Sequence, residues 1–512
     1  MSDSRAKGEG DANDVPRFAM GGIGRHTLVY GAGIVLSQSV SFLMLPIYTR
    51  YLTPADYGVM ELIELALDLI ATVAGARIAV GIFRYYHKAG DPESQNAVVS
   101  TAFLVLSLSY LTVGAATALC AEPLARLVFG STENAPLIRL AAGALACTSL
   151  TIAPLTFARV RERSTLFVLA NASLLVAKVG LNLLFLVGLG LGVKGVFLSN
   201  LLASVFVGGA LAIYLVRNVG LRWSRSATRD LLRYGIPLVG TQLATFVATF
   251  GDRFFLNAAA DEAAVGLYGL AYRFGFLLAA VGYMPFELVW EPARFSIARR
   301  PDREEVLARG FVYLNLLLLS AAVGISLFVH EVLVVMAAPA FHPAAAIVPV
   351  IVVAYVFQGW VGVQDIGILI REKTEYVTLA NWIAAGVAVA GYALFIPRYL
   401  AWGAAGVTVV AFAVRWLGVY CASQRLWPVR YRWSPVLRMA ALGVATVAVG
   451  LTLPELGLWT ALAVKTVLFA GFLLACWHLG GLAADERREL AGMASSLRAA
   501  LRRGGAAEGA RG

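Results

Sequence analysis

Charged side chains are scarce in this sequence, and that shortage limits the class of protein it can be. Asp, Glu, Lys and Arg make up 14% of the 512 residues, whereas a soluble domain carries about 25%. Hydrophobic residues reach 59%, and the mean hydropathy is +0.75. Soluble cores cannot bury such an excess of apolar side chains, so the composition excludes an ordinary soluble protein.

Motifs for several common chemistries are also missing. The sequence contains neither the G-x-x-x-x-G-K-[ST] phosphate loop nor H-E-x-x-H, so we expect no nucleotide hydrolysis of that type and no zinc protease. Its four cysteines are far apart, without the spacing of a metal site or a disulfide framework. The net charge of +11 is spread over short clusters between apolar runs rather than gathered in one domain. We therefore expect no nucleic-acid partner, no cofactor and no metal.

Long apolar runs, by contrast, recur along the whole chain. Each is about 20 residues long, the length that a helix needs to cross about 30 Å of hydrocarbon. We predict an all-α polytopic membrane protein with about fourteen spans, the first two near residues 26–47 and 57–83. The expected segments are a tail (1–25), an N-lobe of six spans (26–218), a basic linker (219–233), a C-lobe of six spans (234–422), two further spans (423–483) and a basic amphipathic tail (484–512).

The positions of Lys and Arg predict how the chain is oriented. Basic residues favour short loops on the cytoplasmic side of a membrane. With both termini cytoplasmic, the richest clusters fall inside, namely Arg159, Arg161 and Arg163; Arg217, Arg222, Arg225, Arg229 and Arg233; Arg294, Arg299, Arg300 and Arg303; and Arg425, Arg430, Arg432 and Arg438. We therefore predict an even number of spans, with both termini on the cytoplasmic side.

An internal repeat relates the two halves. The stretch YGAGIVLSQSVSFLMLPIYTRYL resembles YGIPLVGTQLATFVATFGDRFFL, which aligns Arg50 with Arg253, and the following spans align Gly58 with Gly266. Chance similarity between apolar segments is the alternative. Transporters built from such repeats place their site near mid-membrane at the repeat interface.

Charges within the spans indicate where that site lies. Glu61, Glu64 and Asp68 follow one another at i, i+3 and i+7, so they share one helical face. Glu61 falls about 6 Å from the start of its span and Asp68 about 16 Å, near mid-membrane. We thus expect Glu61 near the membrane surface. Arg77 lies on the opposite side of a straight helix from Asp68, which requires a bend near Gly75 or a different neighbour.

Basic residues within or beside spans form the second set. Arg50, Arg77, Arg253 and Arg273 suit an anionic substrate, because guanidinium pairs with phosphate through two parallel bonds. The alternative for each is an interhelical ion pair, or a side chain that reaches the headgroups. We favour this alternative for Lys178, Arg415 and Lys465.

Three stretches carry a resemblance to a known family. LPIYTRYLTPADYGVMEL, FRYY and RYGIPLVGTQ with GDRFFLN and VGLYGLAYRFG are similar to polysaccharide flippases of the Wzx (RfbX-like) type. That family belongs to the MOP superfamily, with the multidrug MATE exporters and the lipid II flippases. The resemblance implies a V-shaped pair of six-helix lobes plus two helices, working by alternating access.

The resemblance also implies a cargo and partners. The cargo would be an undecaprenyl-pyrophosphate-linked oligosaccharide, and the partners membrane lipids, a polysaccharide polymerase and chain-length proteins. Arg50, Arg253 and Arg273 match lumenal arginines of the family by motif position, whereas Arg77 is assigned from its depth alone. Glu64, Asp68 and Asp252 are candidates to bind a coupling proton or sodium ion, because acids at such depth are usually functional.

Three rival functions share part of this pattern. A MATE-like exporter of cationic drugs should have an acid-dominated cavity, which the arginines disfavour. A lipid II flippase would differ mainly in its cargo. A polysaccharide polymerase or ligase would present catalytic groups on a long outer loop, and the longest outer segment, near residues 118–136, is poor in candidate bases. We therefore expect a transporter rather than an enzyme.

Overall fold

The described part of the chain is entirely helical. The computed structural model describes residues 44–75, 77–454, 457–488 and 492, and no strand occurs among them. Eleven helices in these ranges are long and apolar enough to cross a membrane. The all-α membrane architecture is thereby confirmed. The predicted first span, near 26–47, lies largely outside the described residues, so the count of fourteen stays a prediction.

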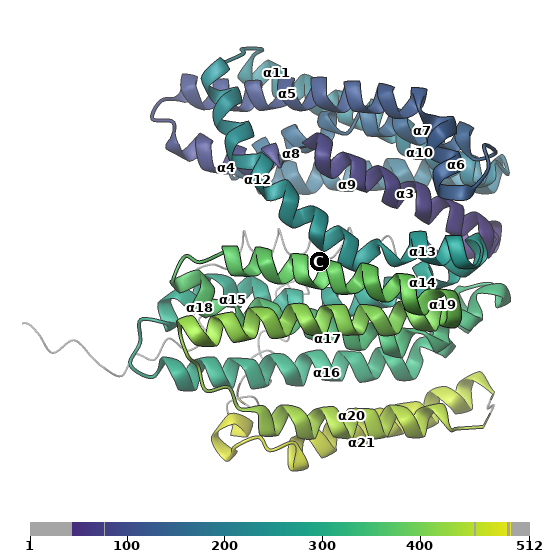
Figure 1. The fold of residues 1–512 in the computed structure, drawn as a ribbon, viewed down its shortest axis with the longest axis vertical. Coiled ribbons are helices and arrows are strands. Elements are labelled where there is room, and N and C mark those ends of the chain that lie inside the picture. The colour runs from purple at the N-terminus through teal and green to yellow at the C-terminus, as the bar shows by residue number, and fades with distance from the viewer. Residues whose placement is uncertain (1–43, 76, 455–456, 489–491, 493–512) are drawn as a thin grey trace, which may run out of the picture.

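The first half of the chain forms one helical bundle, drawn in purple to blue in Figure 1. Its buried core brings together side chains from six of its helices and Leu231 of the helix that follows them. The elements are α2 (Leu45–Tyr51), α3 (Pro54–Gly75), α4 (Ile78–Lys88), α5 (Pro92–Leu119), α6 (Ala121–Phe129), α7 (Ala135–Ala146), α8 (Ser149–Val160), α9 (Ser164–Asn182), η1 (Leu183–Gly188), α10 (Gly192–Ala203), η2 (Ser204–Gly208) and α11 (Gly209–Val219).

The second half forms another bundle, drawn in teal to green. Its elements are α12 (Arg225–Phe250), α13 (Asp252–Ala259), α14 (Glu262–Leu278), η3 (Ala279–Tyr283), α15 (Met284–Ile297), α16 (Arg303–Met336), η4 (Pro339–Ala346), α17 (Val348–Gln364), α18 (Ile366–Ile370) and α19 (Glu375–Leu426). Within α19, Leu400 has φ 47° and ψ −127°, so two helices meet there, three residues after Pro397. This break falls between the spans that the sequence predicts near residues 377–396 and 402–422.

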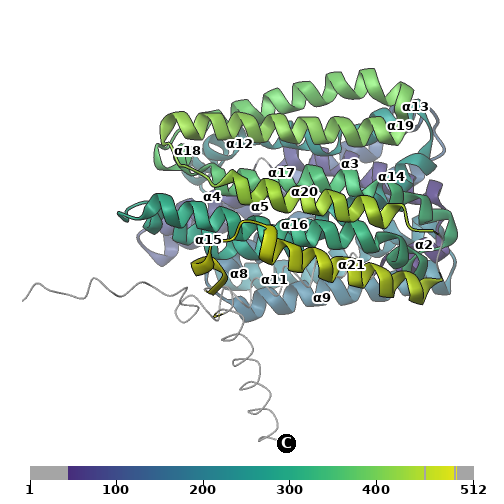
Figure 2. The same ribbon diagram turned by 90° about the horizontal axis from the view of Figure 1, so that it is seen from below.

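Two further helices, α20 (Trp433–Leu451) and α21 (Leu458–Leu479), lie on the side of the C-lobe away from the N-lobe (Figure 1). In the view from below, they lie in front of α16 (Figure 2). A buried ion pair joins α21 to α16, with Lys465 Nζ 2.6 Å from Glu331 Oε1. The two extra helices of the predicted architecture therefore pack against the C-lobe.

The segment between the lobes differs from the predicted linker. Only residues 220–224 are irregular, because Ser224 caps α12 by accepting a hydrogen bond from the backbone N–H of Ala227. The first half of α12 packs on the N-lobe, where Arg84 lies over the Tyr234 ring at 4.9 Å. Its second half packs on the C-lobe, where Thr241 hydrogen-bonds Thr378. Helix α12 thus crosses from one lobe to the other, as Figure 1 shows.

The ends of the helices define two sides of the molecule. The last turns of α4, α15 and α18 lie at one side in Figure 1, and α6 and α13 lie at the other. We call the first side the basic end, because the junction of α15 and α16 there contains Arg294, Arg299, Arg300 and Arg303. Which membrane leaflet faces this end stays a prediction.

The lobes contact each other directly at the opposite end. Gly58 of α3 packs on α14, where a Cβ atom would lie 1.7 Å from the carbonyl oxygen of Glu262. Gly266 packs reciprocally on α3, where a Cβ would lie 2.0 Å from the carbonyl oxygen of Pro54. Only glycine permits backbones to approach so closely. The two glycines aligned by the repeat thus meet across the lobe interface.

Two hydrogen bonds close the same end. Asn257 of α13 donates to the carbonyl of Val128 in α6 at 2.7 Å. Thr49 of α2 lies 3.4 Å from the carbonyl oxygen of Met336 at the end of α16. Both contacts run between the lobes, so separating the lobes at this end requires breaking them.

Candidate functional site

An ionic cluster lies at the inner edge of the lobe interface. Glu61 of α3 places its Oε2 atom 3.3 Å from Nη2 of Arg273 in α14 and its Oε1 atom 3.7 Å from Nε of Arg253 in α13. Its carboxylate also packs against Gly269, where a Cβ would lie 3.1 Å from Cδ. One N-lobe acid therefore faces two C-lobe arginines.

Asp252 holds Arg253 from within the C-lobe. Its Oδ1 atom accepts from Nη1 of Arg253 at 2.8 Å, and both side chains are fully buried. Its Oδ2 atom accepts from the hydroxyls of Tyr268 at 2.7 Å and Tyr272 at 3.2 Å, and lies 3.3 Å from Oγ1 of Thr408. A buried carboxylate is stable only when paired and hydrogen-bonded in this way.

The guanidinium of Arg253 is only partly satisfied. It lies over the Tyr272 ring at 3.8 Å, and Nη1 also donates to the carbonyl of Thr249 at 2.9 Å. Its Nε and Nη2 atoms are buried and have no hydrogen-bond partner among the described residues. The 3.7 Å from Nε to Glu61 is too long for a hydrogen bond. The Nε donor thus faces Glu61 without a hydrogen bond to it, and the buried Nη2 donor is unpaired as well.

The cluster is charge-balanced, which differs from a purely cationic cavity. Arg253 and Arg273 carry two positive charges, and Asp252 and Glu61 carry two negative charges, so the sum is zero. The Arg273 side chain is 30% exposed and that of Arg253 is fully buried. Of this pair, only Arg273 is accessible to a cargo in this conformation.

The other predicted arginines are not part of the cluster. Arg50 is exposed in the last turn of α2. Arg77 is exposed at the start of α4 and has a left-handed φ of 53°, so the helix is interrupted there. Of the two alternatives, a bend near Gly75 or a different neighbour for Arg77, the structure shows the bend, because α3 ends at Gly75 and α4 begins at Ile78. About 21 Å of α3 separate that bend from Glu61, because each helical residue rises 1.5 Å.

The coupling-ion candidates occupy three different environments. Asp252 is buried in the ion pair with Arg253. Glu64 is partly buried and lies within electrostatic range of Arg273 and Lys178. Asp68 is exposed, one turn farther along the same face of α3. Exposure therefore increases from Glu61 through Glu64 to Asp68, away from the closed end.

Some residues of the cluster were not found from the sequence. Glu61 was given only a position near the membrane surface and no role in the site, and the structure shows its side chain buried, at 6% exposure, between Arg253 and Arg273. Counting residues along a helix gives the depth of a side chain in the membrane, but it does not show which neighbouring helix that side chain faces. One signal in the sequence could have shown the hydrogen bonds to Asp252. Tyr268 and Tyr272 are one helical turn apart, so their hydroxyls lie on the same face of α14.

Three basic residues were assigned to structural roles. Lys465 forms the ion pair with Glu331, and Arg415 donates from Nη1 to Oε1 of Gln358 at 2.5 Å. Both contacts join neighbouring helices, but only that of Lys465 is the predicted interhelical ion pair, because Gln358 carries no charge. Lys178 lies near Glu64.

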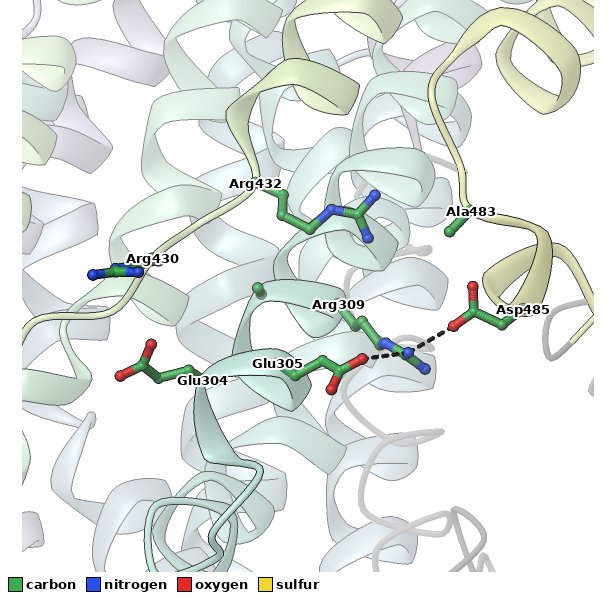
Figure 3. A pocket seen from close by; sticks show the side chains of 8 residues that line it. Glu304, Glu305, Arg309, Arg430, Arg432, Ala483 and Asp485 are labelled. Carbon is green, nitrogen blue, oxygen red and sulfur yellow. Dashed lines mark hydrogen bonds and ion pairs between the residues drawn. The ribbon is translucent and has the colours of Figure 1, made fainter.

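A separate pocket of about 420 Å³ lies at the basic end. It is formed by the start of α16, the connection between α19 and α20, and the chain after α21. Arg309 is held there between Glu305 at 2.5 Å and Asp485 at 2.6 Å (Figure 3). Glu486, fully buried, pairs with Arg432. These contacts attach the C-terminal segment, whose amphipathic part lies outside the described residues.

Comparison with known proteins identifies the family. The profile of the family described as "Polysaccharide biosynthesis protein" matches residues 23–298, more than half of the chain. The chain belongs to this family. A search of curated proteins finds no match.

Solved structures of similar fold are MOP-superfamily transporters. The lipid II flippase MurJ in an inward closed conformation has a TM-score of 0.72 at 12% identity, covering 88% of this chain and 98% of that one. An inward-facing MATE multidrug resistance transporter has a TM-score of 0.63 at 18% identity, covering 76% and 94%. An outward-facing MATE transporter has a TM-score of 0.56 at 16% identity, covering 81% and 98%. The two-lobed architecture predicted from the sequence is thereby confirmed.

Proposed function

We propose that this protein moves an undecaprenyl-pyrophosphate-linked oligosaccharide from the cytoplasmic to the periplasmic leaflet of the bacterial inner membrane. The export would serve the synthesis of a surface polysaccharide, such as O-antigen, capsule or exopolysaccharide. The observation that carries the proposal is the family match over residues 23–298, joined to the transporter fold of the whole chain.

The charged cluster gives this proposal a physical basis. Arg273 and Arg253 converge on one point between the lobes, and guanidinium groups bind phosphate oxygens through paired, charge-assisted hydrogen bonds. A pyrophosphate would lie there while the lipid tail stays in the bilayer. Arg50 and Arg77 would contact the cargo elsewhere along its length.

Transport would proceed by alternating access. The lobes touch through Gly58 and Gly266 at the end opposite the basic end. Opening there would expose the cargo to the other side of the membrane. Glu64, Asp68 and Asp252 are proposed to take up the coupling proton or sodium ion, since buried or deep acids commonly do so in transporters.

Accumulation of lipid-linked sugar on one leaflet tests this function. A strain lacking the gene should accumulate the lipid-linked repeat on the cytoplasmic leaflet, and the wild-type gene should restore export. Arg273→Ala should fail to restore it. Arg139→Ala is the matched control, because Arg139 forms an exposed pair with Glu122 and does not belong to the cluster. Normal surface glycan in the deletion strain would contradict the proposal, and accumulation of lipid II instead would identify lipid II as the cargo.

A further inference from the structure

Glu61 occupies the point at which the two cluster arginines converge, and this suggests a role in selecting the cargo. We propose that Glu61 is a specificity-determining residue: it acts as an internal substitute for the cargo pyrophosphate and keeps the lobes closed until an anion displaces it. This inference rests on the proposed function, because it concerns how that cargo opens the interface.

The position of Glu61 places it between the closed seal and the more open part of the interface. Toward the seal, α3 and α14 are in backbone contact at Gly58 and Gly266. In the other direction, Glu64 is partly buried and Asp68 is exposed. Glu61 is therefore the last acid of the face before the seal. An anion that advances along α3 meets Arg273 first and then Glu61.

The hydrogen bonding around Arg253 is incomplete in a way that an anion can complete. The Nε and Nη2 donors are fully buried and unpaired among the described residues, although a carboxylate lies 3.7 Å from Nε. Buried guanidinium donors without a partner are rare and unfavourable. A pyrophosphate has more oxygens than a carboxylate, so one group can bind both Arg253 donors and Arg273.

The charge balance makes the exchange selective for anions. The four charges of the cluster already sum to zero. A pyrophosphate that binds Arg273 brings negative charge beside Glu61, and like charges at such distances repel. Glu61 then leaves the arginines. Because Glu61 belongs to one lobe and both arginines to the other, its departure removes the ionic link across the interface. A neutral lipid has no such effect.

Distance measurements across the closed end test the inference. The full-length protein, with Cys120, Cys147, Cys421 and Cys476 replaced by serine, is reconstituted in nanodiscs and spin-labelled at Ala55→Cys and Ala260→Cys. Both positions are exposed and lie in different lobes at the closed end. The probe is farnesyl diphosphate, and farnesol is its uncharged control. Double electron–electron resonance, a pulsed electron paramagnetic resonance method, then gives the distribution of distances between the two spin labels.

The expected results are specific to Glu61. Farnesyl diphosphate should shift the wild-type distribution to longer distances, and farnesol should not. Glu61→Gln should give the longer distribution without any probe, and Glu61→Asp should behave as wild type. Glu122→Gln is the matched control, since Glu122 is also an N-lobe acid in an ion pair, with Arg139, but does not belong to the cluster, and it should leave the unliganded distribution unchanged.

A binding measurement provides a second readout if the labelled Glu61→Gln protein is unstable. Glu61→Gln should bind farnesyl diphosphate at least about tenfold more tightly than wild type, because the competing carboxylate is gone. An unchanged distribution and unchanged affinity in Glu61→Gln would overturn the inference, even if transport of the lipid-linked sugar is normal. If the distance shifts are as expected but the wild-type gene does not restore export of the lipid-linked sugar to the deletion strain, the proposed cargo would be rejected and the role of Glu61 would stand.

Discussion

Gly58 and Gly266 lie against each other across the lobe interface, each facing a backbone carbonyl of the opposite helix. A Cβ on Gly58 would be 1.7 Å from the oxygen of Glu262, and a Cβ on Gly266 would be 2.0 Å from that of Pro54. The internal repeat aligns these same two residues. Equivalent positions of the two halves therefore contact each other at the lobe interface. The seal between the lobes thus depends on two positions without a side chain.

Adding one methyl group at this contact should open the seal. We expect Gly58→Ala to force α3 away from α14, at a cost of about 1–3 kcal/mol or more from overpacking. Labelling of Ala260→Cys by a membrane-impermeant thiol reagent should increase, and the unfolding temperature should fall. Gly180→Ala is the control, since nothing lies within 4 Å of a Cβ there. Equal behaviour of the two variants would disprove the role of the contact.

Arg253 and Asp252 should behave as a stability pair. Arg253→Ala leaves the fully buried Asp252 carboxylate without its ionic partner, and such a loss typically costs about 3–5 kcal/mol. The unfolding temperature in detergent should therefore fall strongly. The double variant Asp252→Asn, Arg253→Met should recover much of it, because no uncompensated charge remains. Additive losses in the double variant would contradict the pairing.

Arg273 should matter for transport more than for stability. Its side chain is 30% exposed, and it makes one ion pair at 3.3 Å, with Glu61. Arg273→Ala should reduce flipping at least tenfold, as expected from losing a charge-assisted contact of roughly 1.5–3 kcal/mol. Arg273→Lys should recover part of the activity, since lysine lacks the bidentate geometry. The readout is flipping rate per folded protein; a large fall in unfolding temperature with unchanged flipping would contradict this.

Lys465 and Glu331 should attach the two outer helices. Lys465→Met leaves Glu331, which is 4% exposed, without its lysine partner, and its remaining ionic contact is then His330 Nδ1 at 3.9 Å. We expect a lower unfolding temperature and faster proteolysis between α20 and α21. Adding Glu331→Gln should restore stability, because the uncompensated charge is removed. Proteolysis unaffected by Lys465→Met would argue against the attachment.

Asp68 is the most accessible of the coupling candidates. If it binds the coupling ion, Asp68→Asn should make transport insensitive to an imposed proton or sodium gradient while the protein still folds. Asp56→Asn, at the exposed start of α3 where the side chain accepts from Thr53, is the matched control. A normal response of Asp68→Asn to both gradients would remove Asp68 from the coupling set.

Much of the fold follows from composition and pattern. Continuous apolar runs predict transmembrane helices because the bilayer satisfies no backbone polar group. The break at Leu400 and the bend at Arg77 were also predictable, from a nearby proline and from the charge pattern. The start of α12 was not predicted. The cluster of arginines there indicated a loop, but Ser224 caps a helix that begins at Arg225.

The candidate site was predicted less completely. The sequence indicated Arg253, Arg273 and Asp252, and the structure brings these three together. It did not indicate that Glu61 pairs with Arg253 and Arg273, because these arginines come from the other half of the chain. Nor did it indicate that the site is neutral, since pairing between helices depends on their relative rotation.

The most direct test of this account is flipping by the purified protein. Proteoliposomes would contain a fluorescent undecaprenyl-pyrophosphate-linked oligosaccharide, and an impermeant quencher would report the fraction on the outer leaflet. The account predicts that wild-type protein makes the whole pool accessible, that Arg273→Ala protein does not, and that Arg139→Ala protein acts as wild type. Equal accessibility with wild-type and protein-free vesicles would contradict it.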